Sequence, residues 1–136
     1  MVELIFVIVI LGVLSAIAIP RLAASRDDAE IVKGRSDVAS IRSGIVLTRS
    51  QNMLQGITGY PNPLDTATAG NDGDQLFTNV LDYPIYARAS SGHWRKDDND
   101  TYSFSVNSGW TSFDYNVSNG RFECNHGNQS CKDLTE

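Results

Sequence analysis

The stretch LIFVIVILGVLSAIAI, from Leu4 to Ile19, decides the architecture of this 136-residue chain. It contains no charged residue and one hydroxyl side chain, Ser15, and it is directly preceded by Glu3. The rest of the sequence is polar and rich in Asp, Asn, Ser and Gly. This uneven distribution excludes an ordinary cytosolic globular protein, whose apolar residues are spread along the chain to build one core.

The charges are distributed unevenly as well. The formal net charge of −5 comes from residues 54–136, whereas residues 1–53 are close to neutral. An acidic balance argues against a general nucleic-acid binder, which needs a basic face. We therefore expect a near-neutral rod followed by an acidic head.

Three interpretations of the apolar stretch are open. It matches the apolar region of a secretory signal peptide with a cleavage site at 16–18, but the basic residues that precede such a region are missing. It also matches a plain transmembrane anchor, although sixteen residues at ~1.5 Å each cover about 24 Å of a ~30 Å hydrocarbon core. Neither interpretation explains Glu3. A carboxylate persists in an apolar environment when it has a cationic partner, and the candidate here is an α-amino group, either its own or that of a neighbouring copy. The third interpretation is therefore a bundle of identical helices that Glu3 holds in register.

Residues 1–20 closely resemble the mature N-terminal helix of type IV pilins and type II secretion pseudopilins. The shared features are an acid near the start, an uncharged block, a glycine at Gly12 and a proline at Pro20. In the family this pattern begins two residues earlier, with a methylated aromatic residue and a threonine. The resemblance implies that Glu3 is the assembly carboxylate and that the helix between Gly12 and Pro20 loses regular hydrogen bonding in the filament. A simple kink at Pro20 is the alternative.

The resemblance also implies partners and a location. The chain is expected to form a homo-oligomeric helical filament and to contact pilus or secretion assembly machinery. It is expected to be stored in the inner membrane before it enters a cell-surface pilus or, alternatively, a periplasmic pseudopilus.

An amphipathic segment follows Pro20. Apolar residues recur at helical spacing on one face of it and predict a helix that reaches about Leu54, where Gly and Pro residues end it; they are Ile31, Val38, Ile41 and Ile45. We expect three parts: residues 1–25 as a membrane or filament-core helix, 26–54 as the amphipathic half of the same helix, and 55–136 as a β head.

The head shows a strand pattern. Residues 101–106, 110–117 and 121–124 alternate between apolar and polar side chains, and a weaker run covers 84–89. These runs predict an antiparallel meander of three or four strands whose apolar face covers the helix. The expected fold class is α+β, a pilin-like lollipop with a long N-terminal helix on a small antiparallel sheet.

Cys124 and Cys131 lie seven residues apart near the C-terminal end. In an exported head, such a pair favours a disulfide that closes a short loop, and it resembles the C-terminal disulfide loop of pilins. Two alternatives are free thiols and a zinc site that adds His126, although this spacing matches no standard structural zinc pattern.

Other candidate ligands lie in loops. The acidic segments 71–74 and 97–100 offer oxygen ligands for calcium, and pseudopilins as a family are known for a calcium site among the head loops. Solvated turns are the alternative, so we expect no cofactor other than this calcium candidate. Asn99 and Asn116 lie in N-x-S/T patterns, each with an Asp two residues before it, and are candidate glycosylation sites.

A local basic and aromatic cluster is a candidate DNA contact, because cations and aromatic rings together bind phosphates and stack on bases. It consists of Arg88, Trp94, Arg95 and Lys96. The alternative is a charged turn with Trp94 packed on the head. No nucleophile accompanies the two histidines, and no phosphate-binding glycine loop occurs, so we expect no enzyme.

These observations together predict a structural subunit that polymerises into a type IV pilus filament serving adhesion, motility or DNA uptake. Two alternatives remain. One is a periplasmic type II secretion pseudopilin, and the other is a membrane-anchored binding module that does not polymerise.

Overall fold

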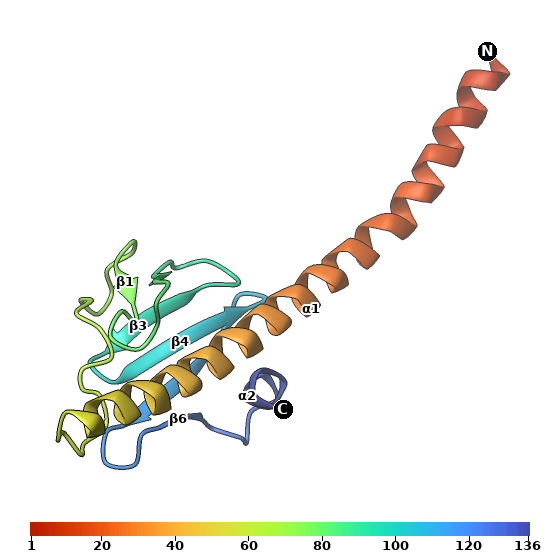
Figure 1. Ribbon diagram of the computed structural model, residues 1–136. Coiled ribbons are helices and arrows are strands. Elements are labelled where there is room, and N and C mark those ends of the chain that lie inside the picture. Colours follow the sequence, from red (N-terminus) through yellow and green to blue (C-terminus); the bar gives the residue numbers. More distant parts are fainter.

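The computed structural model describes residues 1–136 and shows one long helix with a small β head attached to its C-terminal half (Figure 1). Helix α1 runs from Val2 to Leu54, 53 residues, which at ~1.5 Å per residue makes it about 80 Å long. Its N-terminal half projects away from the head (Figure 1). The predicted α+β lollipop and the end of the helix at Leu54 are confirmed.

The projecting half of α1 is one continuous helix. Every residue from Met1 to Arg26 is exposed, and the helix passes through Gly12 and Pro20 without a break. Figure 1 shows the ribbon curving along this half. Because proline lacks an N–H, the helix loses one backbone hydrogen bond at Pro20. The loss of further hydrogen bonds between Gly12 and Pro20 concerns the filament and stays a prediction.

The head is built on a four-stranded antiparallel sheet in the order β3-β4-β5-β6. Its strands are β3 (Trp94–Asp98), β4 (Thr101–Val106), β5 (Gly109–Asn116) and β6 (Arg121–Cys124). The predicted strands correspond to β4, β5 and β6, with a shift of one residue in β5. A two-stranded sheet of β1 (Gln75–Leu76) and β2 (Ile85–Tyr86) lies in the connection before β3.

The sheet packs its aromatic face against the helix. Val38, Ile41 and Ile45 of α1 are buried as predicted, whereas Ile31, nearer the point where the helix leaves the head, is only half-buried. The rings that fill the space are almost fully buried and touch one another; they are Phe77, Trp94, Tyr102, Phe104, Phe113 and Phe122.

Two glycines of α1 allow this close packing. A Cβ at Gly34 would lie 2.5 Å from the Phe104 ring and 2.6 Å from Leu134, and a Cβ at Gly44 would overlap the backbone carbonyl of Val80. Glycine in a helix interior costs about 1 kcal/mol relative to alanine. Both glycines lie where the head packs so closely on the helix that a side chain would clash.

A short helix completes the head. Helix α2 (Gln129–Thr135) was not predicted from the sequence, and it buries Cys131 and Leu134. The Cys124–Cys131 disulfide joins α2 to the end of β6, with 5.8 Å between the two Cα atoms. The predicted disulfide is therefore present, and the zinc alternative is wrong because both sulfurs are bonded to each other.

Candidate assembly interface

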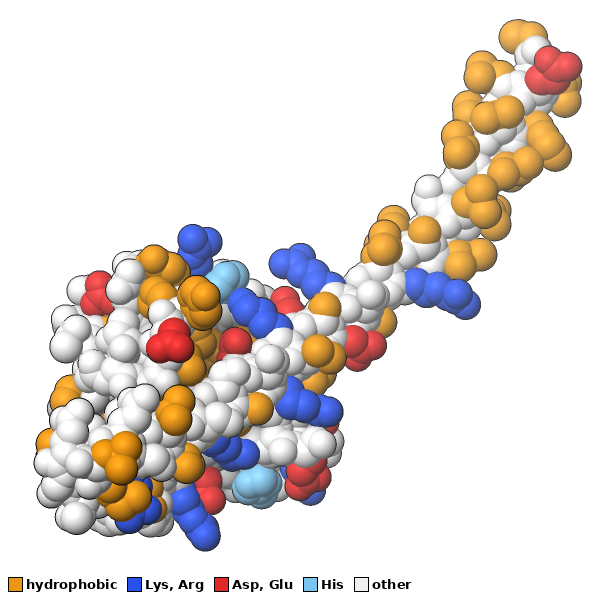
Figure 2. Space-filling model, viewed as in Figure 1, with side chains coloured by type: hydrophobic (Ala, Val, Ile, Leu, Met, Phe, Trp, Pro, Cys, Tyr) orange, Lys and Arg blue, Asp and Glu red, His pale blue; other side chains and the backbone are white.

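The projecting half of α1 carries apolar surface that the molecule itself does not cover. The large apolar side chains between Leu4 and Ile19 are 42–67% exposed. Figure 2 shows hydrophobic side chains around the whole visible side of this segment, with an acidic group near its tip. The helix is long and apolar enough to cross a membrane, a property that an N-terminal signal sequence shares. Such a surface requires lipid or other protein around it.

Glu3 is the one charged side chain among residues 1–20. It lies exposed in the first turn of α1, where the positive end of the helix dipole favours a carboxylate. No ion pair joins it to another group of the same molecule. Its charge is therefore free to pair with a group outside the subunit.

A polar clamp holds α1 where it leaves the head. Glu30 accepts hydrogen bonds from the Ser91 hydroxyl (2.7 Å) and the Asn107 backbone N–H (3.1 Å), and its carboxylate lies 3.7 Å from Arg26. Burial acts to raise the pKa of Glu30, but the two hydrogen bonds and the charges of Arg26 and His93 outweigh it, so the pKa is lowered. The clamp fixes the direction in which the apolar segment projects from the head.

Three arginines follow one flank of α1 across the head. Arg35 donates to the Asp133 carbonyl (2.6 and 3.0 Å), and Arg42 donates to the Phe122 carbonyl (3.0 Å). Arg49 lies 4.1 Å from the centre of the Tyr60 ring and donates to its hydroxyl (2.8 Å). We call Arg35, Arg42 and Arg49 the arginine row. Its signal in the sequence is the repeat of seven residues, which places all three on one side of a helix.

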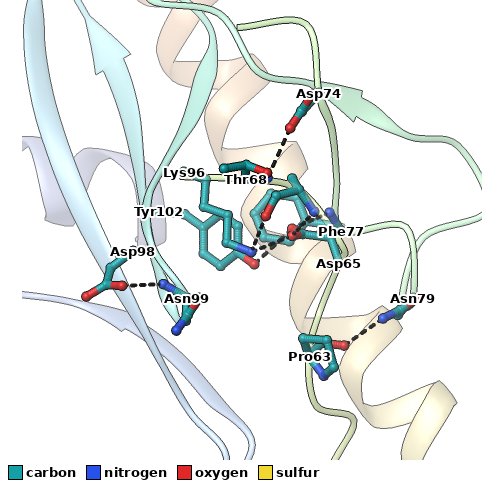
Figure 3. Close-up of polar contacts among 11 residues, drawn as sticks. Pro63, Asp65, Thr68, Asp74, Phe77, Asn79, Lys96, Asp98, Asn99 and Tyr102 are labelled. Carbon is teal, nitrogen blue, oxygen red and sulfur yellow. Dashed lines mark hydrogen bonds and ion pairs between the residues drawn. The ribbon is translucent and has the colours of Figure 1, made fainter. Parts of the chain in front are cut away.

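A buried carboxylate joins the loop after α1 to the sheet (Figure 3). Asp65 is 1% exposed and accepts hydrogen bonds from Lys96 Nζ (2.7 Å), Tyr102 Oη (2.8 Å) and the Phe77 backbone N–H (3.0 Å). The backbone N–H of Ala67 donates to it as well. Burial and the neighbouring Asp65 charge raise the pKa of Tyr102, so its hydroxyl stays protonated and donates. This buried network is structural, and sequence analysis missed it.

The predicted DNA-contact cluster is not a surface patch. Trp94 and Lys96 point into the head, with 0% and 5% exposure, because they occupy alternate positions on β3. The Trp94 indole N–H donates to Asp37 of α1 at 3.0 Å. Burial raises the pKa of Asp37, and the opposing effects of this hydrogen bond and of the Lys33 charge are smaller. Trp94 and Lys96 are therefore wrong as DNA contacts.

The other two members of the cluster also lie apart. Arg95 faces outward, 4.1 Å from the centre of the Trp110 ring, and pairs with Asp97 at 2.6 Å. Arg88 is exposed beyond β2 and lines a hollow with Asp37 and His93. The four residues do not form one basic surface, which removes the geometric basis of the DNA prediction.

The candidate ligand and modification sites lie in turns and at the ends of strands β3 and β5. No group of three or more His, Cys, Asp or Glu side chains is arranged to hold a metal ion. The Asp74 carboxylate accepts the Thr68 backbone N–H, and the Asp98 carboxylate accepts the Asn99 backbone N–H. Calcium binding stays a prediction. Asn99 and Asn116 are both exposed, so their glycosylation also stays a prediction.

Comparisons with protein-family models, with curated proteins and with solved structures found no match to this chain. The function proposed for the chain therefore depends on the sequence pattern of residues 1–20 and on the surfaces described above.

Proposed function

We propose that this chain is the structural subunit of a filament of the type IV pilus kind. In the filament, the apolar segments of many parallel copies form the core and the heads face solvent. The observation that supports this proposal is the combination of an uncovered apolar helix, a single unpaired carboxylate at its tip and a folded head at its other end.

The apolar segment suits both a membrane and a filament core. Moving it from lipid into a bundle of identical helices gains no hydrophobic free energy, since lipid tails are as apolar as leucine. Polar contacts and close packing must then favour the filament. Glu3 supplies such a contact when it meets the terminal amine of a neighbouring copy, because an unpaired charge in an apolar core is costly. The inner membrane is thus the store from which subunits are drawn, with the help of pilus or secretion assembly machinery.

The contact between copies is heterologous, since Glu3 of one copy pairs with the N-terminus of the next. Heterologous contacts that do not close into a ring produce open helical filaments. A cell-surface pilus for adhesion, motility or DNA uptake and a short periplasmic pseudopilus are both filaments that such a contact would build.

Electron microscopy of material sheared from cells that express the full chain, labelled with an antibody to the head, tests the proposal. Abundant long labelled fibres are expected for a pilus. Short fibres confined to the periplasm would instead indicate a pseudopilus. A chain that stays in the membrane fraction under all conditions would show a non-polymerising anchor and refute the proposal.

Replacement of Glu3 by Ala distinguishes the requirements of membrane insertion from those of filament assembly. The variant is expected to enter the membrane as the unchanged chain does, because the change removes a charge from an apolar segment. It is expected to form no fibres, because the contact that fixes the register is lost. Normal fibres from this variant would show that Glu3 does not set the register.

A further inference from the structure

The arginine row carries positive charge that the subunit leaves unneutralised. Arg35, Arg42 and Arg49 bind backbone carbonyls and a tyrosine, and none of them lies within 4.0 Å of a carboxylate. Residues seven apart on a helix with ~1.5 Å rise per residue are separated by about 10.5 Å. Figure 2 shows basic side chains spaced along α1 over the head. The row is thus a regular series of cations on an otherwise acidic protein.

A second series, of opposite charge, crosses the outer face of the sheet. Asp98, Thr101, Asp114 and Glu123 are register partners on the four successive strands. Thr101, Asp114 and Glu123 face away from α1, because their neighbours Tyr102, Phe113 and Phe122 face the core. Asp98, which follows the register shift in β3, is exposed beside Thr101. Its three carboxylates are exposed, and we call them the acidic row: Asp98, Asp114 and Glu123.

The acidic row is poorly neutralised within the molecule. Asp114 accepts a hydrogen bond from the Thr101 hydroxyl at 2.9 Å, and Glu123 lies 3.4 Å from Arg121. Asp98 has no basic partner. Strands are spaced by about 4.8 Å, so Asp98 and Asp114, two strands apart, are separated by about 9.6 Å. This spacing is close to the one between successive members of the arginine row, whereas Asp114 and Glu123, on adjacent strands, are only about 4.8 Å apart.

We propose that the arginine row of one copy docks on the acidic row of a neighbouring copy in the filament. This inference rests on the proposed function and names the contact between heads. The two rows lie on different sides of the head and cannot meet within one molecule, so their pairing is heterologous and propagates without closing. Copies with a net charge of −5 repel one another at long range. A contact that juxtaposes opposite charges overcomes this repulsion and selects one orientation.

Double-stranded DNA is the other partner that a row of arginines suits. The acidic row and the negative head disfavour it, because a DNA-binding domain presents a basic face. A second copy of this chain offers three exposed carboxylates of the opposite charge, and DNA binding becomes an outcome of the test.

The first experiment neutralises the acidic row in the full chain with Asp98→Asn, Asp114→Asn and Glu123→Gln. These replacements keep the size and much of the hydrogen bonding of exposed side chains, so the head is expected to fold. The matched control carries Asp72→Asn, Asp82→Asn and Glu136→Gln, which remove three exposed charges elsewhere.

The acidic-row variant is expected to need about tenfold more subunit than the unchanged chain before sedimentable filament forms, a change equivalent to about 1.4 kcal/mol per added subunit. The control is expected to match the unchanged chain. Raising the salt to about 1 M, where the Debye length is about 3 Å, is expected to reduce the yield of the unchanged chain as well. An equal loss in both variants, or a loss in neither, would overturn the inference.

Charge reversal provides the second experiment. Arg42→Glu and Asp114→Arg are each expected to lower the filament yield, and the double variant is expected to recover it. Circular dichroism of each full-length variant checks folding, because Arg42 also contacts the head. A double variant no better than either single variant would contradict the pairing.

Failure of the inference is distinguishable from failure of the proposed function. If the unchanged chain forms no filaments, both fail. If it forms filaments that the acidic-row variant forms equally well, the proposed function stands and the docking contact is wrong. Binding of a DNA duplex that Arg35→Gln and Arg49→Gln abolish, with filament yield unchanged, would assign the row to DNA and also overturn the inference.

Discussion

Replacement of Asp65 by asparagine removes the only carboxylate that contacts the buried ammonium group of Lys96. The Lys96 side chain is 5% exposed and its other hydrogen-bond partner is the Ala67 carbonyl, so water solvates its charge very little. Removing one partner of a buried ion pair costs about 3–5 kcal/mol. We expect Asp65→Asn and Lys96→Met each to lower the free energy of unfolding by an amount in this range.

The double variant separates coupling from simple loss of contacts. With both charges removed, the amide oxygen of the introduced asparagine still accepts a hydrogen bond from Phe77 or Tyr102, and no charge is left unpaired. Residues in direct contact show interaction free energies of about 0.5–3 kcal/mol in such cycles. We therefore expect the loss of unfolding free energy in the double variant to be smaller than the sum of the two single losses by about 2–3 kcal/mol.

Urea unfolding of the full chain in mild detergent, followed by tryptophan fluorescence, measures these losses. With a slope of about 1.5 kcal/mol per M, a loss of about 3 kcal/mol lowers the midpoint by about 2 M. Additive losses, or an Asp65→Asn variant within about 0.5 kcal/mol of the unchanged chain, would refute the view that this pair fastens the loop to the sheet.

Three further predictions concern α1 and its contacts. Gly44→Ala is expected to destabilise the head by about 1–3 kcal/mol because its Cβ overlaps a backbone carbonyl, whereas Gly12→Ala, with nothing within 4 Å, is expected to leave the unfolding midpoint unchanged. Asp37→Ala is expected to cost about 1–3 kcal/mol, because the buried Trp94 N–H loses its acceptor; an unchanged urea midpoint would contradict this. Because the pKa of Glu30 is lowered on folding, its contribution to stability is present above its usual value of 4.5 and is lost as the pH falls below it. Urea titrations of Glu30→Gln are expected to show a loss relative to the unchanged chain at pH 7 that shrinks at pH 3, and a constant difference would contradict the linkage.

Local patterns were enough to predict the long helix and three of the strands. The stripe that contains Val38, Ile41 and Ile45 has a helical period, and residues 101–106 alternate as a strand does. These patterns depend only on which face of an element is buried. The disulfide was predicted on other grounds, because a pair of cysteines seven residues apart in an exported head favours a short closed loop.

Strand β3 was missed because its burial depends on distant partners. The sequence Trp94-Arg95-Lys96 is typical of a basic, exposed segment, but Lys96 is neutralised by Asp65, 31 residues away, and the Trp94 indole donates to Asp37, 57 residues away. A lysine is almost never fully buried without a partner, and a single sequence does not show which acid that partner is. Helix α2 is only seven residues long and depends on the disulfide and on its contact with α1.

The surface on which the proposed function depends is visible in the sequence only in part. The apolar segment and Glu3 are apparent from the sequence because they are adjacent in it: an acidic residue directly precedes an uncharged apolar block. The arginine row has a seven-residue period that is equally visible, but its significance depends on the absence of carboxylates around it, which only the folded head shows.

The most direct test of filament assembly through Glu3 compares Glu3→Gln with Glu3→Asp in the full chain, by electron microscopy of the filament fraction and immunoblotting of the membrane fraction. Gln keeps the shape of the side chain and removes its charge, whereas Asp keeps the charge. We predict equal amounts of both variants in the membrane, filaments from Glu3→Asp and none from Glu3→Gln. Filaments of normal yield from Glu3→Gln would contradict the proposed role of the carboxylate.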